Sequence, residues 1–152
     1  MPPVKAIWGL DMQYVCDAED LTWFRLETLG EAALESRAMS HAVERYFREA
    51  HEAAAASYKP PEAVPVSEQN IGLKAHIQRA MPMFLTLRDR EGAALVTAML
   101  PPAGKSERSF RPIVVGPSNA DPYPEHSVAI ALLADHFGFE LDPDRCFPYR
   151  RG

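Results

Sequence analysis

A long stretch without proline constrains this chain more than any other feature. From Leu29 to about Ser57 the sequence is dominated by Ala, Glu, Arg, Leu and Met, a composition that favours one continuous helix. Small and apolar residues recur there at the spacing of one helical face. They are Leu29, Ala33, Ser36, Ser40, Val43, Phe47, Ala50 and Ala54, widened by Ala32, Met39, Ala42 and Tyr46. We expect this face to pack closely against a sheet or a second helix, and another copy of the same helix would serve as that partner.

Aromatic and β-branched residues before this helix predict a β-hairpin. Its two strands are Met12–Cys16 and Leu21–Glu27, and residues 17–20 between them suit a turn. A competing interpretation begins a helix at Asp20 or Thr22, because both residue types are common N-caps. The sequence alone leaves residues 20–28 open between strand and helix.

Two strand-like runs in the later half predict a second hairpin. Residues 83–89 and 93–100 are joined by Arg90, Glu91 and Gly92, and the glycine tolerates the positive φ that such turns need. A further strand is predicted within 109–116. Because Pro112 has no amide donor, we expect that strand at an edge of the sheet or at a bulge.

Two shorter helices complete the pattern. The first would run from about Glu68 to Ala80 with Ser67 as its N-cap, and its inward residues would be Ile71, Leu73, Ala75 and Ile77. The second would begin at Pro124, a residue suited to the first helical position, and end before a left-handed Gly138. Its inward stripe would be Ile130, Leu133 and Phe137, with Phe139 packing beside the helix end.

The order of these elements predicts a single α+β domain spanning residues 1–152. We expect an antiparallel sheet with one long and two shorter helices packed mainly on one face. Residues 59–66 are rich in proline and would form a connector, and residues 140–152 would form a polar C-terminal tail. A chain of 152 residues is long enough to bury a core of its own.

Composition excludes several classes of function. The net charge of −5 gives no basic surface of the kind that binds nucleic acid. No run approaches the roughly 20 apolar residues that cross a bilayer, and the N-terminus lacks the layout of a secretory signal. Cys16 and Cys146 are too few and too far apart in sequence for a disulfide framework, so we expect free thiols and a cytoplasmic protein.

The sequence contains none of the common catalytic or phosphate-binding motifs. Its five histidines lack the short spacing of zinc ligands, so neither a metal nor another cofactor is expected.

The most suggestive segment is the loop 116–126, which leaves a predicted strand and enters a predicted helix. Loops of this kind gather polar groups on a rigid base. Ser118 and Asn119 are candidate ligand-binding residues, and His126 with Asp121 are candidate catalytic residues, His126 as a general base. The same residue types are also ordinary turn, cap and core residues.

Arg108 and Arg111 are further candidates for ligand binding. They flank Phe110, and two guanidinium groups would suit a carboxylate or phosphate. Edge-strand protection explains the same two charges.

These observations favour a non-catalytic module that binds a protein or small ligand and associates with its own copy. The grounds are the small-residue helical face, the proline-rich connectors and the missing catalytic motifs. A small enzyme acting on an acidic small molecule, with the 116–126 loop and His126 as base, is the first alternative. A structural subunit of a larger assembly is the second.

Overall fold

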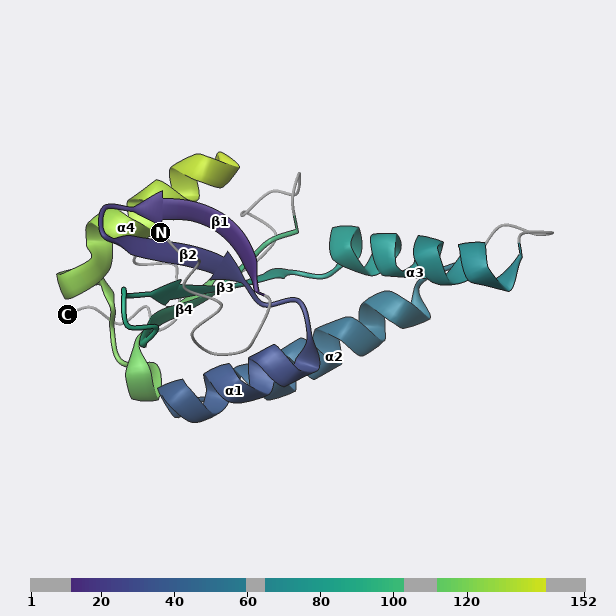
Figure 1. The fold of residues 1–152 in the computed structure, drawn as a ribbon, viewed down its shortest axis with the longest axis horizontal. Coiled ribbons are helices and arrows are strands. Elements are labelled where there is room, and N and C mark those ends of the chain that lie inside the picture. The colour runs from purple at the N-terminus through teal and green to yellow at the C-terminus, as the bar shows by residue number, and fades with distance from the viewer. Residues whose placement is uncertain (1–11, 60–64, 103–111, 142–152) are drawn as a thin grey trace.

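The computed structural model describes residues 12–59, 65–102 and 112–141 and shows an α+β fold built on one antiparallel sheet (Figure 1). The strands lie side by side in chain order: β1 (Gln13–Ala18), β2 (Leu21–Arg25), β3 (Met83–Arg88), β4 (Ala94–Leu100) and β5 (Ile113–Val115). The helices are α1 (Leu29–Met39), α2 (Val43–Ala56), α3 (Val66–Ala80) and α4 (Tyr123–Phe137), with a short 3₁₀ turn, η3 (Pro117–Asn119). The predicted fold class is confirmed.

Both predicted hairpins are present. In the first, Ala18 pairs with Leu21 and the turn places Glu19 at φ 61°, so the alternative helix from Asp20 is wrong. In the second, the Asp89 carboxylate accepts the amides of Glu91 and Ala93, and Gly92 takes φ 90°. The strand after Pro112 is the edge strand β5, as predicted.

The predicted long helix is wrong in one respect: it is broken at residues 40–42. Ser40 takes the left-handed conformation, φ 53° and ψ 54°, and α2 turns back to lie alongside α1 (Figure 1). The Ser36 hydroxyl, on the last turn of α1, accepts the amide of Glu44 at 2.8 Å. That bond satisfies a donor in the first turn of α2 that would otherwise lack a partner, so the break is stabilised by a side chain rather than by glycine or proline.

Because of the break, some of the buried residues differ from those predicted. On α2 the predicted Val43, Phe47 and Ala54 are buried, whereas Tyr46, which was expected to widen the face, is exposed. On α1 the buried residues are Glu31, Ala32, Glu35 and Met39, whereas Leu29, predicted to be buried, is exposed. The buried residues of α1 and α2 therefore do not continue one helical stripe across the break, and each helix packs on the sheet with its own buried residues.

Helix α1 begins at a complete capping box. The Thr28 hydroxyl accepts the amide of Glu31 at 3.1 Å, and the Glu31 carboxylate accepts the amides of Glu27 and Thr28. One first-turn donor, the Glu31 amide, and the amides of the two residues before the helix are thereby satisfied.

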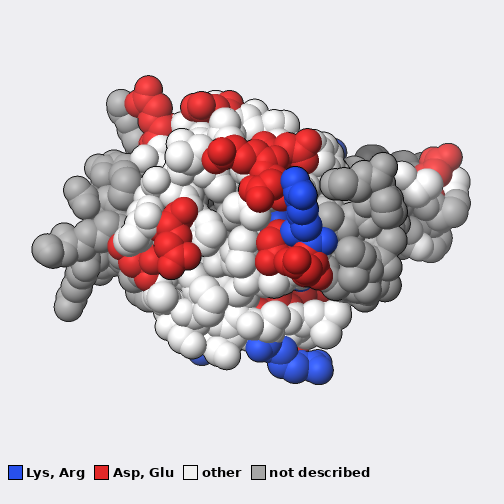
Figure 2. Space-filling model, turned by 60° about the vertical axis from the view of Figure 1, so that its left-hand side comes forward, with Lys and Arg blue, Asp and Glu red and all other residues white. Residues whose placement is uncertain are grey.

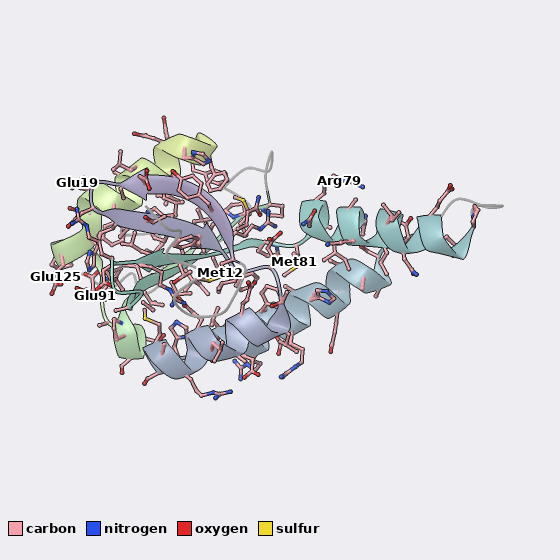
Figure 3. All side chains as sticks on the ribbon, in the orientation of Figure 1. Met12, Glu19, Arg79, Met81, Glu91 and Glu125 are labelled. Atoms are coloured by element: carbon pink, nitrogen blue, oxygen red, sulfur yellow. The ribbon has the colours of Figure 1, made fainter. Side chains whose placement is uncertain are left out.

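The sheet is covered on both faces, whereas the sequence predicts helices mainly on one face. On one face α4 packs its Ile130 and Leu133 over Leu85, Leu87 and other strand residues. The opposite face carries Met12, Phe24 and Phe84 against α1 and α2, and Met12 lies between the sheet and these helices in Figure 3. The reason is visible in β3, every residue of which is buried. A strand buried on both faces needs a layer on each side.

Helix α4 begins and ends close to the predicted residues. It begins at Tyr123, one residue earlier than expected, and ends at Gly138 with φ 76°. The Phe139 amide donates to the Ala134 carbonyl at 2.9 Å, and the Phe139 ring is buried. The Trp23 indole N–H donates to the Ala129 carbonyl at 2.9 Å, which ties the helix to β2.

Helix α3 extends away from the sheet (Figure 1). It begins at Val66 with Pro65 as its N-cap, so the predicted Ser67 cap is wrong. Ile71, expected to face inward, is 71% exposed, and none of the α3 side chains that are described is buried. Polar contacts hold its C-terminal half, including Gln78 Nε2 to Glu27 at 3.1 Å and Ser57 Oγ to His76 at 2.8 Å.

Candidate functional site

A buried polar cluster lies between α1 and the sheet. Its centre is Glu35, a fully buried residue of α1 whose two carboxylate oxygens have different partners. One oxygen forms an ion pair with Arg88 of β3, and the other accepts the hydroxyl proton of Thr97 of β4. A carboxylate in such a place needs partners of this kind, because an unpaired buried charge is strongly destabilising.

Several described partners hold the Arg88 guanidinium. Besides the ion pair, its Nε donates to Thr86 Oγ1 at 2.9 Å and its Nη1 donates to the Gly92 carbonyl at 3.2 Å. The pairing of β3 with β4 shifts register between Leu87 and Arg88. This irregularity lies at the residue that carries the buried cation.

His41 connects this cluster to the surface. It lies in the break between α1 and α2, and its Nε2 is 2.9 Å from Thr97 Oγ1. The single Thr97 hydroxyl proton is given to Glu35, so the hydroxyl can only accept from the ring. Nε2 therefore carries a proton, and Nδ1, 3.4 Å from the Val43 amide nitrogen, accepts that N–H. The ring is neutral, and both of its nitrogens are engaged.

The environment of the ring favours the same protonation state. Burial lowers the pKa of His41 below its ordinary value, and the nearby charge of Glu35 and a backbone hydrogen bond only partly oppose that effect. His41 is therefore uncharged at neutral pH.

A cavity of about 370 Å³ opens beside His41. It lies between the first turn of α2 and the sheet near the β5 edge, and η3 closes one end. Most of its wall is apolar. The lining residues are His41, Ala42, Val43, Tyr46, Phe84, Thr97, Met99, Ile113, Val115 and Asn119. This size and this apolar wall with a few polar groups are typical of sites for small molecules.

A second cavity, of about 390 Å³, lies between α2, α3 and the start of α1. Its wall is more polar and includes Arg25, Glu27, Glu31 and Lys74. Arg25 already donates to the Gln78 carbonyl at 3.2 Å. Both cationic and acidic side chains line this space, so no one class of ligand is favoured there.

The predicted loop residues are placed as follows. Asn119 lines the cavity beside His41, whereas Ser118, Asp121 and His126 are not among its lining residues. The Asp121 carboxylate accepts the Tyr123 amide at 3.1 Å, and His126 Nε2 is 3.8 Å from the Glu125 carboxylate. Ser118 and Asn119 both have positive φ. Arg108 and Arg111 lie outside the described residues. Within the described ranges no group of histidine, cysteine or acidic residues is arranged to hold a metal.

Sequence reasoning missed the four residues that form this site, Glu35, His41, Arg88 and Thr97. One signal was present: Glu35 is an acidic residue between Ala32 and Met39, the residues that widened the predicted stripe. An acid at a buried helical position predicts a partner of opposite charge. The identity of that partner was not readable, because Arg88 is far away in sequence.

Comparison of the chain with protein family models, with curated proteins and with solved structures found no match. Function therefore has to be inferred from the geometry. No helix in the described part of the chain is long and apolar enough to span a membrane.

Proposed function

We propose that this protein is a non-catalytic binding module that holds a small, uncharged and mainly apolar molecule in the cavity beside His41. The proposal rests on the composition of the cavity wall. Phe84, Met99, Ile113 and Val115 offer apolar surface from three adjacent strands, and two polar groups of the wall lie together, with His41 Nε2 2.9 Å from Thr97 Oγ1. A ligand with an apolar body and one hydrogen-bonding group matches that distribution.

The hydrogen bonding of His41 supports binding rather than catalysis. A general base needs a nitrogen within reach of the substrate proton and free to accept it. Nε2 is protonated and donates to Thr97, and Nδ1 accepts the Val43 amide. Neither nitrogen has a free lone pair for a substrate, so the ring contributes its surface to the cavity wall.

The charge of the cavity supports an uncharged ligand. None of the described lining residues carries a charge, because the His41 ring is neutral, and the nearby Glu35 carboxylate forms an ion pair with Arg88. The predicted acidic ligand of the 116–126 loop would instead meet the exposed carboxylate of Glu125. That end of the molecule also carries Glu19 and Glu91 (Figure 3), and Figure 2 shows acidic side chains gathered there.

Self-association remains a separate proposal. The apolar half of the helical face that suggested it, Val43, Phe47 and Ala54, is buried against the sheet. A dimer would therefore use other residues, and the exposed Leu29 and Leu34 of α1 are the apolar side chains available there.

The test is to fill the cavity. The probe is N-phenyl-1-naphthylamine, an uncharged apolar dye whose fluorescence rises when it leaves water. We expect the wild-type protein to bind it and Val115→Phe, which places a ring in the cavity, to weaken binding at least about tenfold, or roughly 1.4 kcal/mol. Val128→Phe on the exposed surface of α4 is the matched control and should bind as wild type does.

Met99→Phe is a second variant at a half-buried wall position, in case Val115→Phe does not fold. Circular dichroism establishes that each variant is folded. Wild-type binding that neither cavity variant weakens would refute this site, and a wild-type protein that binds no dye would refute the proposed function.

A further inference from the structure

Among the described lining residues of the cavity, His41 is the one that can change its charge near neutral pH. It is held by three elements at once: it lies between α1 and α2, and it bonds to Val43 at the start of α2 and to Thr97 of β4. A change in the ring therefore acts on the helix start and on the cavity wall together.

Protonation of the ring would oppose the observed hydrogen bonds. In the imidazolium form both nitrogens carry protons, so Nδ1–H would face the Val43 N–H with no lone pair between them. The contact that now links the ring to the first residue of α2 would become a repulsion between two donors. The start of a helix also carries partial positive charge, which disfavours a cation beside it.

A bound ligand would increase this opposition. Water that reaches the ring through the empty cavity can solvate a charged imidazolium, and an apolar ligand in contact with Phe84 and Met99 displaces that water. Removing solvent from a charged group is costly. Ligand binding and ring protonation therefore oppose each other, and the coupling is the same in both directions.

The charges around the His41 ring affect whether its charged or its neutral form is favoured. Glu35 of α1 faces it through Thr97 and favours the imidazolium, but that carboxylate is also paired with Arg88 of β3. Among the described wall residues, α2 contributes the phenol of Tyr46. The wall residues of β5 and η3 are Ile113, Val115 and Asn119, which carry no charge. The Glu35 carboxylate, which is shared with Arg88, thus favours the imidazolium form of His41. Desolvation and the repulsion between the Nδ1–H and Val43 N–H donors disfavour it.

We propose that His41 makes this cavity a pH-dependent binding site, which holds its uncharged ligand while the ring is neutral and releases it when the ring is protonated. The inference rests on the proposed function. Because the folded chain favours the neutral ring, affinity is full above the ordinary histidine pKa of about 6.5 and falls as the pH drops through the lower pKa of the folded protein.

The experiment is a titration of N-phenyl-1-naphthylamine into the full chain at pH 7.5 and at successive steps of lower pH, within the range where circular dichroism shows the protein folded. We expect the wild-type affinity to fall at least about fivefold, the lower end of typical coupling between two binding events. His41→Gln has no titrating group and should bind with an affinity that is the same at each pH. Nitrogen NMR of the ring should show the Nε2–H tautomer at pH 7.5, and added dye should lower the pKa of His41.

The outcomes separate the two proposals. An affinity that stays constant while His41 titrates, or a fall that His41→Gln shows equally, would overturn the switch and leave the binding site intact. Absence of dye binding at every pH would overturn the proposed function and the switch with it.

Discussion

Glu35 shows how one residue can organise two helices and two strands. Its carboxylate is shared between Arg88 and Thr97, and through Thr97 it sets the tautomer of His41. A buried ion pair of this kind is not strong evidence of stability in itself, because desolvation of both charges offsets much of their attraction. Its effect is to require one arrangement of α1 over β3 and β4.

Removing one charge of this pair is therefore expected to be costly. Glu35→Gln keeps the shape of the side chain but removes the buried carboxylate that forms an ion pair with the Arg88 guanidinium, and we expect the free energy of unfolding to fall by about 3–5 kcal/mol. Urea denaturation followed by circular dichroism measures it. Glu49→Gln removes an exposed carboxylate next to Arg45 and should change stability by less than about 1 kcal/mol. Equal effects of the two substitutions would contradict the role given to the buried pair.

Among the elements, two of the helix-associated glycines, Gly30 and Gly138, provide a matched test. Gly138 ends α4 at φ 76°, where a side chain is strained, so Gly138→Ala should lower the free energy of unfolding by about 1 kcal/mol. Gly30, inside α1, has space for a methyl group, since the nearest atom to an added Cβ is 3.9 Å away. Gly30→Ala should be neutral or stabilising by up to about 1 kcal/mol. Thermal denaturation compares them, and a loss of stability at Gly30 equal to that at Gly138 would count against the assigned helix end.

Elements with local signals could be predicted from the sequence. Both hairpins and the end of α4 follow from alternating residues, turn residues and Gly138, all of which act within a few positions. The break between α1 and α2 could not be predicted, because it depends on Ser36 accepting the Glu44 amide and on a non-glycine residue, Ser40, in the left-handed region. Propensity summed along that stretch still favours a continuous helix.

The cavity was beyond sequence reasoning for a related reason. Its wall is assembled from residues of α2, three strands and η3 that no spacing connects. Asn119 is the single member that the loop pattern identified. The apolar wall residues carry the same pattern as core residues, because a strand presents them in the same alternation whether the space above is filled or empty.

At the scale of the whole molecule, stability should be unevenly distributed. Helices α3 and α4 have equal lengths of 15 residues, but α4 buries four side chains and none of the described side chains of α3 is buried. Local opening depends on such contacts. We expect the amides of α3 to exchange with deuterium at least tenfold faster than those of α4, as measured by hydrogen exchange with mass spectrometry. Equal protection would show that α3 has packing that this fold does not account for.

The order of the strands has a consequence for how the chain assembles. Strands β2 and β3 are paired neighbours, although α1, α2 and α3 all lie between them in sequence. The sheet is thus a simple meander, and the helices form a loop that leaves it and returns to the adjoining strand. The hairpins β1–β2 and β3–β4 can each form from contacts near in sequence, while joining them requires closure of the whole helical loop. Closure entropy grows only with the logarithm of loop length, about 0.6 kcal/mol for each doubling. The connecting segment can therefore gain or lose residues at little thermodynamic cost, provided that the α1–α2 layer continues to cover its face of the sheet.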